Sequence, residues 1–173
     1  MKVVNVGFKG IFDKIYQYIS PKKYWCDRGL KCGNNVIIER TASFDTEPYL
    51  ITIGNNVKIT SNVRFVTHDG GVYVLRNLMN RKELDLFKKI KVGNNVFIGN
   101  RVTIMPGVTI GDNVIIAYGS IVTKSIPSGE VWGGVPAKFI ETLDCYYRKN
   151  EKNFVNTKTM TAQDKKKYLE NKL

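Results

Sequence analysis

The sequence predicts an all-β fold, a parallel β-helix of stacked six-residue repeats with helical segments at both ends. Two observations support this prediction. A five-residue motif with glycine at its second position and valine at its last recurs at residues 32–36, 53–57, 92–96 and 110–114. In addition, large apolar residues return at every sixth position over long stretches, the spacing of one flat face of a three-sided coil.

The apolar anchors in phase are Cys32, Ile38, Phe44, Ile53, Ile59, Phe65, Val92, Ile98, Ile104, Ile110, Ile116 and Val122. Four places after ten of these twelve anchors stands a small or β-branched residue: Val36, Ala42, Val57, Val63, Val96, Val102, Val108, Val114, Ser120 and Ile126. We expect both sets to fill a narrow interior, with three hexads to a coil and successive coils stacked as parallel strands. A β-sandwich would require alternation with a period of two, so it is disfavoured.

Glycine follows the anchor in the recurring motif, and an Asn-Asn or Asp-Asn pair follows the glycine. We expect the glycine to supply backbone angles at the turn that residues with a Cβ resist. The asparagine pairs tolerate similar turn conformations.

Two breaks interrupt the period. Between Phe44 and Ile53 the count slips by three residues, around Glu47. A longer interruption at about residues 70–89 is charged and poorly periodic, and it begins directly after His68. Because insertions in repeat proteins form loops that often carry function, this loop is a candidate part of a site.

The two ends differ from the repeat. Apolar residues at helical spacing predict an amphipathic helix over residues 8–19, and we expect it to cap the open end of the apolar column. Weak contact with a membrane surface stays open, because Lys9, Lys14, Lys22 and Lys23 lie beside this helix. Thr161 marks the start of a C-terminal helix. The predicted parts are residues 1–29, the β-helix at 30–140, and a helical tail at 141–173.

Composition narrows the class of protein. The hydrophobic fraction of 43% in 173 residues is that of a globular domain, and no run is apolar enough to span a membrane. Signal-peptide features are missing, and three cysteines without a CxxC pair predict reduced thiols, so we expect a cytoplasmic protein without a metal. The net charge of +12 is spread along the chain without a nucleic-acid-binding motif. It fits a solvated surface or attraction of a polyphosphate or polyanionic ligand better than nucleic acid.

Residues 30–140 resemble the hexapeptide-repeat acyltransferases, whose fold is a left-handed parallel β-helix. The matching phrases are Ile90–Gly99, Pro106–Gly111, Gly119–Lys124 and Gly133–Lys138. The last two are closest to the galactoside and maltose O-acetyltransferases and to polysaccharide O-acetyltransferases. The resemblance implies left-handed coils, acetyl-CoA as acetyl donor, and a homotrimer with active sites between subunits.

His68 is the only histidine of the chain and stands where the long insertion begins. Acyl transfer needs a base for the proton of the acceptor, and histidine titrates near neutral pH. His68 also matches the position of the family's base, so we expect it to be catalytic. The group that orients its ring stays open between a backbone carbonyl and a carboxylate such as Asp45.

Further roles follow from the resemblance alone. It implies that Asn62 contacts the acceptor hydroxyl and that the backbone N–H of Asn100 serves the oxyanion. The acetyl-CoA groove would be lined by Phe97, Ala117, Tyr118, Gly119, Thr123 and Lys124, with Gly134, Pro136 and Lys138 near the nucleotide. Glu141 stands where the galactoside type has a second basic residue, which weakens the assignment of individual phosphate contacts.

The acceptor is less defined than the donor. The candidate acceptor-contacting residues, at the start of the inserted loop and within it, are Asp69, Tyr73, Arg76, Asn77 and Arg81. O-acetylation of a carbohydrate, in surface polysaccharide synthesis, is the leading hypothesis. N-acetylation of an amino sugar, free or nucleotide-linked, is the alternative. A metal site of the γ-carbonic-anhydrase kind is disfavoured because one histidine cannot supply three ligands, and a purely structural β-helix would not need the donor-binding phrases.

Overall fold

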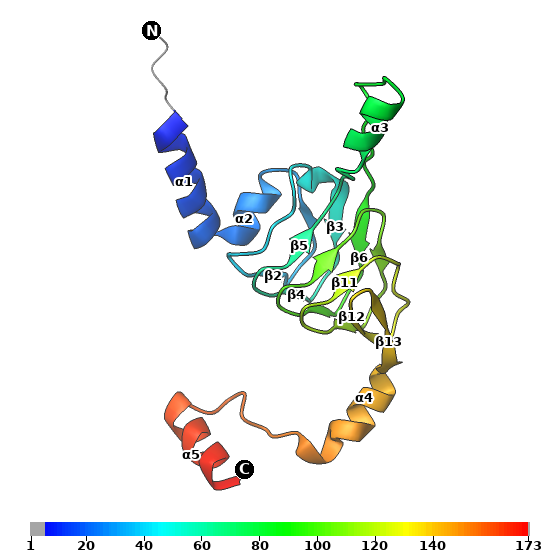
Figure 1. The fold of residues 1–173 in the computed structure, drawn as a ribbon. Helices are drawn as coiled ribbons and strands as arrows, with labels where there is room; N and C mark the ends of the chain where they lie inside the picture. The colour runs from blue at the N-terminus through cyan, green and yellow to red at the C-terminus, as the bar shows by residue number, and fades with distance from the viewer. Residues whose placement is uncertain (1–5, 173) are drawn as a thin grey trace. The chain divides into compact units, whose positions relative to one another are not determined.

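The computed structural model describes residues 6–172, and for residues 6–9 only the backbone. The chain divides into two compact units, the first ending at Leu143 and the second beginning at Asp144. The first unit carries the repeat (Figure 1). In the described part of the chain, no helix is both long and apolar enough to cross a membrane.

Three sheets form the three sides of the coil, and their strands stack in parallel (Figure 1). The first holds β1 (Lys31–Cys32), β3 (Ile51–Ile53), β6 (Ile90–Val92) and β9 (Thr109–Ile110). The second holds β2 (Ile37–Ile38), β4 (Val57–Ile59), β7 (Val96–Ile98), β10 (Val114–Ile116), β12 (Glu130–Gly134) and β13 (Ala137–Thr142). The third holds β5 (Arg64–Phe65), β8 (Thr103–Ile104) and β11 (Ile121–Val122). Only β13, which turns back on β12, is antiparallel among these described pairs.

Most of the interior consists of the residues that the period selected, and Leu30, Ile51 and Ile90 add to it from outside the repeat phase. Eleven of the twelve anchors are buried, and the exception, Cys32, is half-buried at the first coil. The ten small or β-branched residues four places later are buried as well. Each coil therefore contributes the same apolar cross-section, and stacking the coils joins these into one hydrophobic column. At the first coils the column is aromatic, where the rings of Phe44 and Phe65 stack with centroids 4.7 Å apart.

The recurring glycines have a different role from the one predicted. Gly54 does not take a positive φ; the second asparagine of the motif does, with φ of 54° at Asn56. A Cβ on Gly54 would stand 2.5 Å from the carbonyl oxygen of Gly93 in the next coil. Glycine is required here because neighbouring coils approach too closely for a side chain, and asparagine tolerates the left-handed turn.

Side chains at the same corner form a polar ladder. The Oδ1 of Asn55 accepts the N–H of Asn34 at 2.8 Å, and the Oδ1 of Asn94 accepts the N–H of Asn55 at 2.9 Å. Asp112 continues the ladder by accepting the N–H of Asn94. Side-chain oxygens of each coil thus accept hydrogen bonds from backbone N–H groups in the turn of the coil before it. The recurring motif therefore fixes the stacking register as well as the turn.

The N-terminal end of the column is covered mainly by α2 (Pro21–Cys26). Trp25 of this short helix is buried, and its ring lies 5.2 Å from that of Phe44. The longer helix α1 (Val6–Ile19) starts two residues before the predicted bound. The expectation that α1 caps the column with its apolar face is wrong, since Phe12 and Ile19 are 66% and 72% exposed.

Two interruptions shape the surface near His68. The slip of three residues contains the short 3₁₀ turn η1 (Pro48–Leu50). The longer insertion contains the helix α3 (Val72–Leu78), and its two ends pair, with a bridge between His68 and Phe87. The second unit holds α5 (Ala162–Lys172), capped by Thr161 through the N–H of Asp164. α4 (Leu143–Asn150) and the 3₁₀ turn η2 (Glu151–Asn153) precede it.

Candidate active site

His68 lies on an edge of the prism where the third sheet ends. The edge follows β5, β8 and β11, and we call it the base edge, made of residues 66–68, 105–107 and 123–124. The N–H of Val66 bonds to Ile104, and the N–H of Met105 bonds to Val122, so these three segments stack directly. The backbone of His68 is fixed by the stem of the inserted loop, where the N–H of Lys88 donates to Thr67 at 2.9 Å.

Two carboxylates hold the imidazole from one side. The Nδ1 of His68 lies 3.1 Å from Oδ2 of Asp45 and 3.3 Å from Oε2 of Glu47. Both carboxylates are largely buried, while the His68 side chain is 40% exposed. The ring is therefore anchored at one nitrogen by acceptors, and its other edge faces accessible space. The orienter that the sequence left open is this pair.

Thr67 links the two carboxylates. Its N–H donates to Asp45 at 2.9 Å, and its hydroxyl donates to Glu47 at 2.8 Å. Burial alone would raise the pKa of Glu47, but hydrogen bonds from Thr46, Thr67 and His68 outweigh it and hold that pKa below its usual value of 4.5. Glu47 is accordingly an ionised acceptor at neutral pH.

This geometry assigns the proton of a neutral imidazole. Carboxylates accept and do not donate, so Nδ1 carries the hydrogen between Asp45 and Glu47. The lone pair then lies on Nε2, for which the described residues provide no hydrogen-bond partner. A histidine arranged in this way can take a proton at Nε2 and is stabilised by the two carboxylates once it is charged.

A hollow of about 280 Å³ adjoins His68. His68 and Glu47 line it together with residues of the inserted loop, which include two of the predicted acceptor residues, Asp69 and Arg76. The guanidinium of Arg76 pairs with Asp85, also in the wall. Predicted acceptor residues that do not line this hollow are Tyr73, Asn77 and Arg81. Asn77 donates to the carbonyl of Tyr73 at 3.2 Å, and Arg81 pairs with Glu83.

The remaining predicted catalytic residues gather at a second edge. Asn62 and Asn100 line a separate hollow of about 420 Å³ with Tyr118 and Gly119. We call this the Tyr118 edge, made of residues 60–62, 99–101 and 117–119, which follow β4, β7 and β10. Within one chain, then, Asn62 and Asn100 do not share the His68 hollow. The third sheet separates the two edges, because Asn62 precedes β5 and His68 follows it.

The predicted cofactor residues are divided between these two edges. On the Tyr118 edge, the ring of Tyr118 lies 6.2 Å from that of Phe97, and Gly134 donates its N–H to Ser120. Ala117 there bonds through its N–H to Trp132, and on β13 the exposed Lys138 pairs with Gly133. Pro136, also exposed, lies in the turn between β12 and β13. Thr123 and Lys124 are instead exposed on the base edge, along the stack from His68.

The three side chains around Nδ1 also have the composition of a candidate metal site. One ligand atom each from Asp45, Glu47 and His68 lie within 4.8 Å of one another, so the three could hold an ion. Their hydrogen bonds with one another and with Thr67 already account for the arrangement. The set favours orientation of a base over a metal centre.

Comparison with known proteins identifies the family. Residues 89–124 match the family described as bacterial transferase hexapeptide (six repeats). Protein CapG of Staphylococcus aureus is 47% identical over 147 residues, which cover 83% of this chain and 84% of CapG. Galactoside O-acetyltransferase of Escherichia coli is 42% identical over 117 residues, covering 65% of this chain and 56% of that protein. The chain belongs to the hexapeptide-repeat acetyltransferases.

Solved structures of this acetyltransferase family agree with the fold. A galactoside acetyltransferase in complex with coenzyme A superposes with a TM-score of 0.61 at 29% identity, covering 82% of each chain. The parallel coil described above is thus the left-handed β-helix that this hexapeptide-repeat family implies.

From the sequence, Glu47 was placed at the slip in the repeat, but its contact with His68 was not predicted. The sequence nevertheless contains a signal for this contact. Lys31 pairs with Thr52 and Ser43 with Arg64, so one coil in this region spans 21 residues. Three hexads make 18 residues, and the slip of three supplies the rest. When the three extra residues are counted as part of the coil, the position one coil before His68 is residue 47, which is Glu47.

Proposed function

We propose that this acetyltransferase moves the acetyl group of acetyl-CoA to a carbohydrate hydroxyl, with His68 as general base. The observation that supports it most is the position of the His68 Nδ1 between Asp45 and Glu47, which leaves Nε2 to accept a proton. Membership of the acetyltransferase family supports the reaction class, and the coenzyme A complex of the galactoside enzyme supports the donor.

The proposed chemistry proceeds in two proton transfers. Nε2 of His68 takes the proton of the acceptor hydroxyl as the oxygen attacks the thioester carbonyl, giving a tetrahedral oxyanion. The intermediate collapses by breaking the C–S bond, and the imidazolium returns its proton to the departing thiolate. The products are the acetyl ester and free coenzyme A. Asp45 and Glu47 stabilise the imidazolium between the two transfers.

The oxyanion requires a donor, and the N–H of Asn100 is proposed for this role. In the described residues the carbonyl of Asn100 accepts from Gly119, whereas no hydrogen bond uses its N–H. A free backbone donor on an exposed corner is available to a developing negative charge. Asn62 lines the same hollow and is proposed to contact the acceptor hydroxyl.

The division of these residues between two edges supports an intersubunit site. His68 and Lys124 lie on the base edge, whereas Asn100 and Tyr118 lie on the Tyr118 edge. Asn62 and His68 lie before and after β5, and they line two separate hollows, so we infer that one chain does not supply both sets to a single substrate. We propose a homotrimer in which the base edge of one subunit faces the Tyr118 edge of the next, with the donor groove between them.

The proposed acceptor class rests on the relatives and on the loop. The galactoside O-acetyltransferase, at 42% identity, is named for a sugar acceptor. Asp69 and Arg76 line the His68 hollow and offer polar groups to an acceptor. We propose a glycan of a surface polysaccharide as acceptor.

The test follows release of free thiol from acetyl-CoA against a panel of sugars, oligosaccharides and amino sugars. We expect turnover with a hydroxyl acceptor and a loss of roughly 10³-fold or more in His68→Ala. Equal turnover of wild type and His68→Ala on a good acceptor would refute the base. Mass spectrometry of the product separates an ester from an amide, and sedimentation as a stable monomer would refute the intersubunit site.

A further inference from the structure

The helix α1 is amphipathic in an unusual orientation, because its polar side faces the protein. Asp13 pairs with Arg28 at 3.0 Å, and Gln17 donates to the carbonyl of Ala42 at 3.4 Å. Tyr16 bonds to Asp27 and packs edge-on against Tyr24, with ring centroids 5.7 Å apart. These contacts set the rotation of α1 against the coil unit.

The apolar residues of α1 lie on the other side and are uncovered. Five of them are between 48% and 72% exposed: Ile11, Phe12, Ile15, Tyr18 and Ile19. At 100° per residue they occupy a stripe roughly 120° wide. Figure 1 shows α1 leading into α2 at the start of the coil. A continuous apolar stripe of this size on an exposed helix is the mark of a docking surface.

The charge around the stripe identifies its partner. Residues 1–31 contain seven Lys or Arg and only two Asp. Both of those carboxylates, Asp13 and Asp27, are engaged on the protein side, with Arg28 and Lys23. Exposed cations therefore border the stripe: Lys14 lies along one side of it on the helix, and Arg40 lies over the ring of Tyr18 at 4.2 Å.

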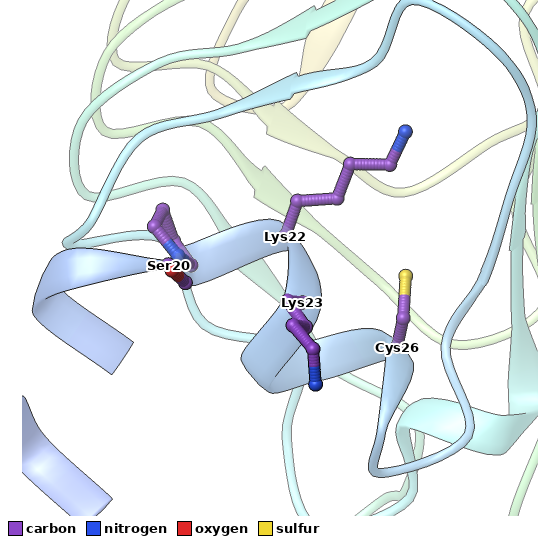
Figure 2. A pocket seen from close by; sticks show the side chains of 5 residues that line it. Ser20, Lys22, Lys23 and Cys26 are labelled. Carbon is purple, nitrogen blue, oxygen red and sulfur yellow. The ribbon is translucent and has the colours of Figure 1, made fainter. Parts of the chain in front are cut away.

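The elbow after α1 adds a hollow of about 460 Å³. It is lined by Ser20, Pro21, Lys22, Lys23 and Cys26, and Figure 2 shows Ser20 at the turn into α2 and Lys22, Lys23 and Cys26 on α2 itself. Lys22 donates to the carbonyl of Gly33 at 3.2 Å, which holds its ammonium group near this end of the coil. The apolar stripe thus ends beside a small hollow with a fixed cation.

We propose that α1 docks on an anionic lipid bilayer, with its apolar stripe at the boundary between headgroups and acyl chains. Apolar side chains flanked by Lys and Arg are what such a surface recognises. A second copy of α1 fits less well, since two copies would bring the cations around Lys14 and Arg40 together. Lipid phosphates would neutralise them instead. The proposal does not rest on the proposed acetyl transfer.

The experiment is cosedimentation of the full chain with vesicles of phosphatidylcholine, with and without phosphatidylglycerol. We expect the chain to bind the anionic vesicles. Its partition coefficient for neutral vesicles should be lower by on the order of a hundredfold, because about three cations then lack anionic lipid partners. Raised salt should weaken binding for the same reason. Phe12→Ser with Ile15→Ser should lower partition by roughly tenfold or more.

Ile37→Ser is the matched control, because Ile37 is an exposed isoleucine on β2 and outside the stripe. It should bind vesicles like wild type, and circular dichroism should show all variants folded. Two results would overturn the proposal. One is no binding of wild type to anionic vesicles at low salt. The other is a lower oligomer mass of the Phe12 and Ile15 variant together with unchanged vesicle binding, which would assign the stripe to a second copy.

Discussion

Replacing the carboxylates around His68 by amides tests the base arrangement most directly. Asp45→Asn and Glu47→Gln keep size and remove charge, so they change the electrostatics at Nδ1 with little change in packing. Each amide can still accept from Nδ1 through its oxygen. What is lost is stabilisation of the imidazolium that is proposed to form during acyl transfer.

The magnitude follows from the two distances. A unit charge pair at about 3.1 to 3.3 Å interacts by roughly 5 kcal/mol at an effective dielectric of 20, and by about 1 kcal/mol in water. Because the His68 side chain is 40% exposed, solvent screening places the value toward the lower part of this range. At about 1 to 3 kcal/mol, each single variant should lose roughly fivefold to 150-fold in kcat/KM.

The assay is steady-state thiol release at varied acetyl-CoA and at varied acceptor. The loss should appear in kcat, with the KM for acetyl-CoA little changed, because neither carboxylate is expected to contact the donor. The double variant should approach His68→Ala, since no charge then remains beside Nδ1. Asp144→Asn removes a 65% exposed carboxylate that pairs with Arg148 and should have no effect. Full activity in the double variant, with His68→Ala inactive, would refute the role of the carboxylates.

Three further predictions concern stability. The lowered pKa of Glu47 stabilises the folded chain above about pH 4.5, and this contribution disappears as pH falls below that value. As the pH is lowered, the thermal unfolding midpoint of Glu47→Gln should thus fall less steeply than that of wild type. Parallel curves of midpoint against pH for the two proteins would contradict the prediction. Gly54→Ala should destabilise by about 1–3 kcal/mol in urea because its Cβ would meet the next coil 2.5 Å away, whereas Gly10→Ala, with open space, should not. Phe65→Ala should cost about 3–5 kcal/mol by the same measurement, against under about 1 kcal/mol for the half-exposed Phe139→Ala.

Much of the fold was predictable because each hexad is a local unit. Whether a residue faces the interior depends on its place within six residues, so the period alone selected Ile53, Ile98 and Ile116 as core. The phase breaks were visible for the same reason. His68 could be selected as the candidate base because a single histidine directly precedes the longer break.

Other features depend on contacts between coils, which a period of six does not contain. The carboxylates at His68 come from the preceding coil, so their approach depends on a coil length of 21 residues set by the slip at Glu47. The requirement for Gly54 likewise comes from the backbone of the next coil rather than from its own turn.

Helix periodicity identified α1 and its apolar side, but not the side that faces the protein. That was decided by polar contacts of Asp13, Tyr16 and Gln17 with distant residues. The sequence alone therefore determined the repeat and its interior and singled out His68 as the proposed base, because these depend on local spacing. The orienting carboxylates, the separation of the two edges and the exposed stripe of α1 were decided by the tertiary structure, because each depends on residues that only the coiling of the chain brings together.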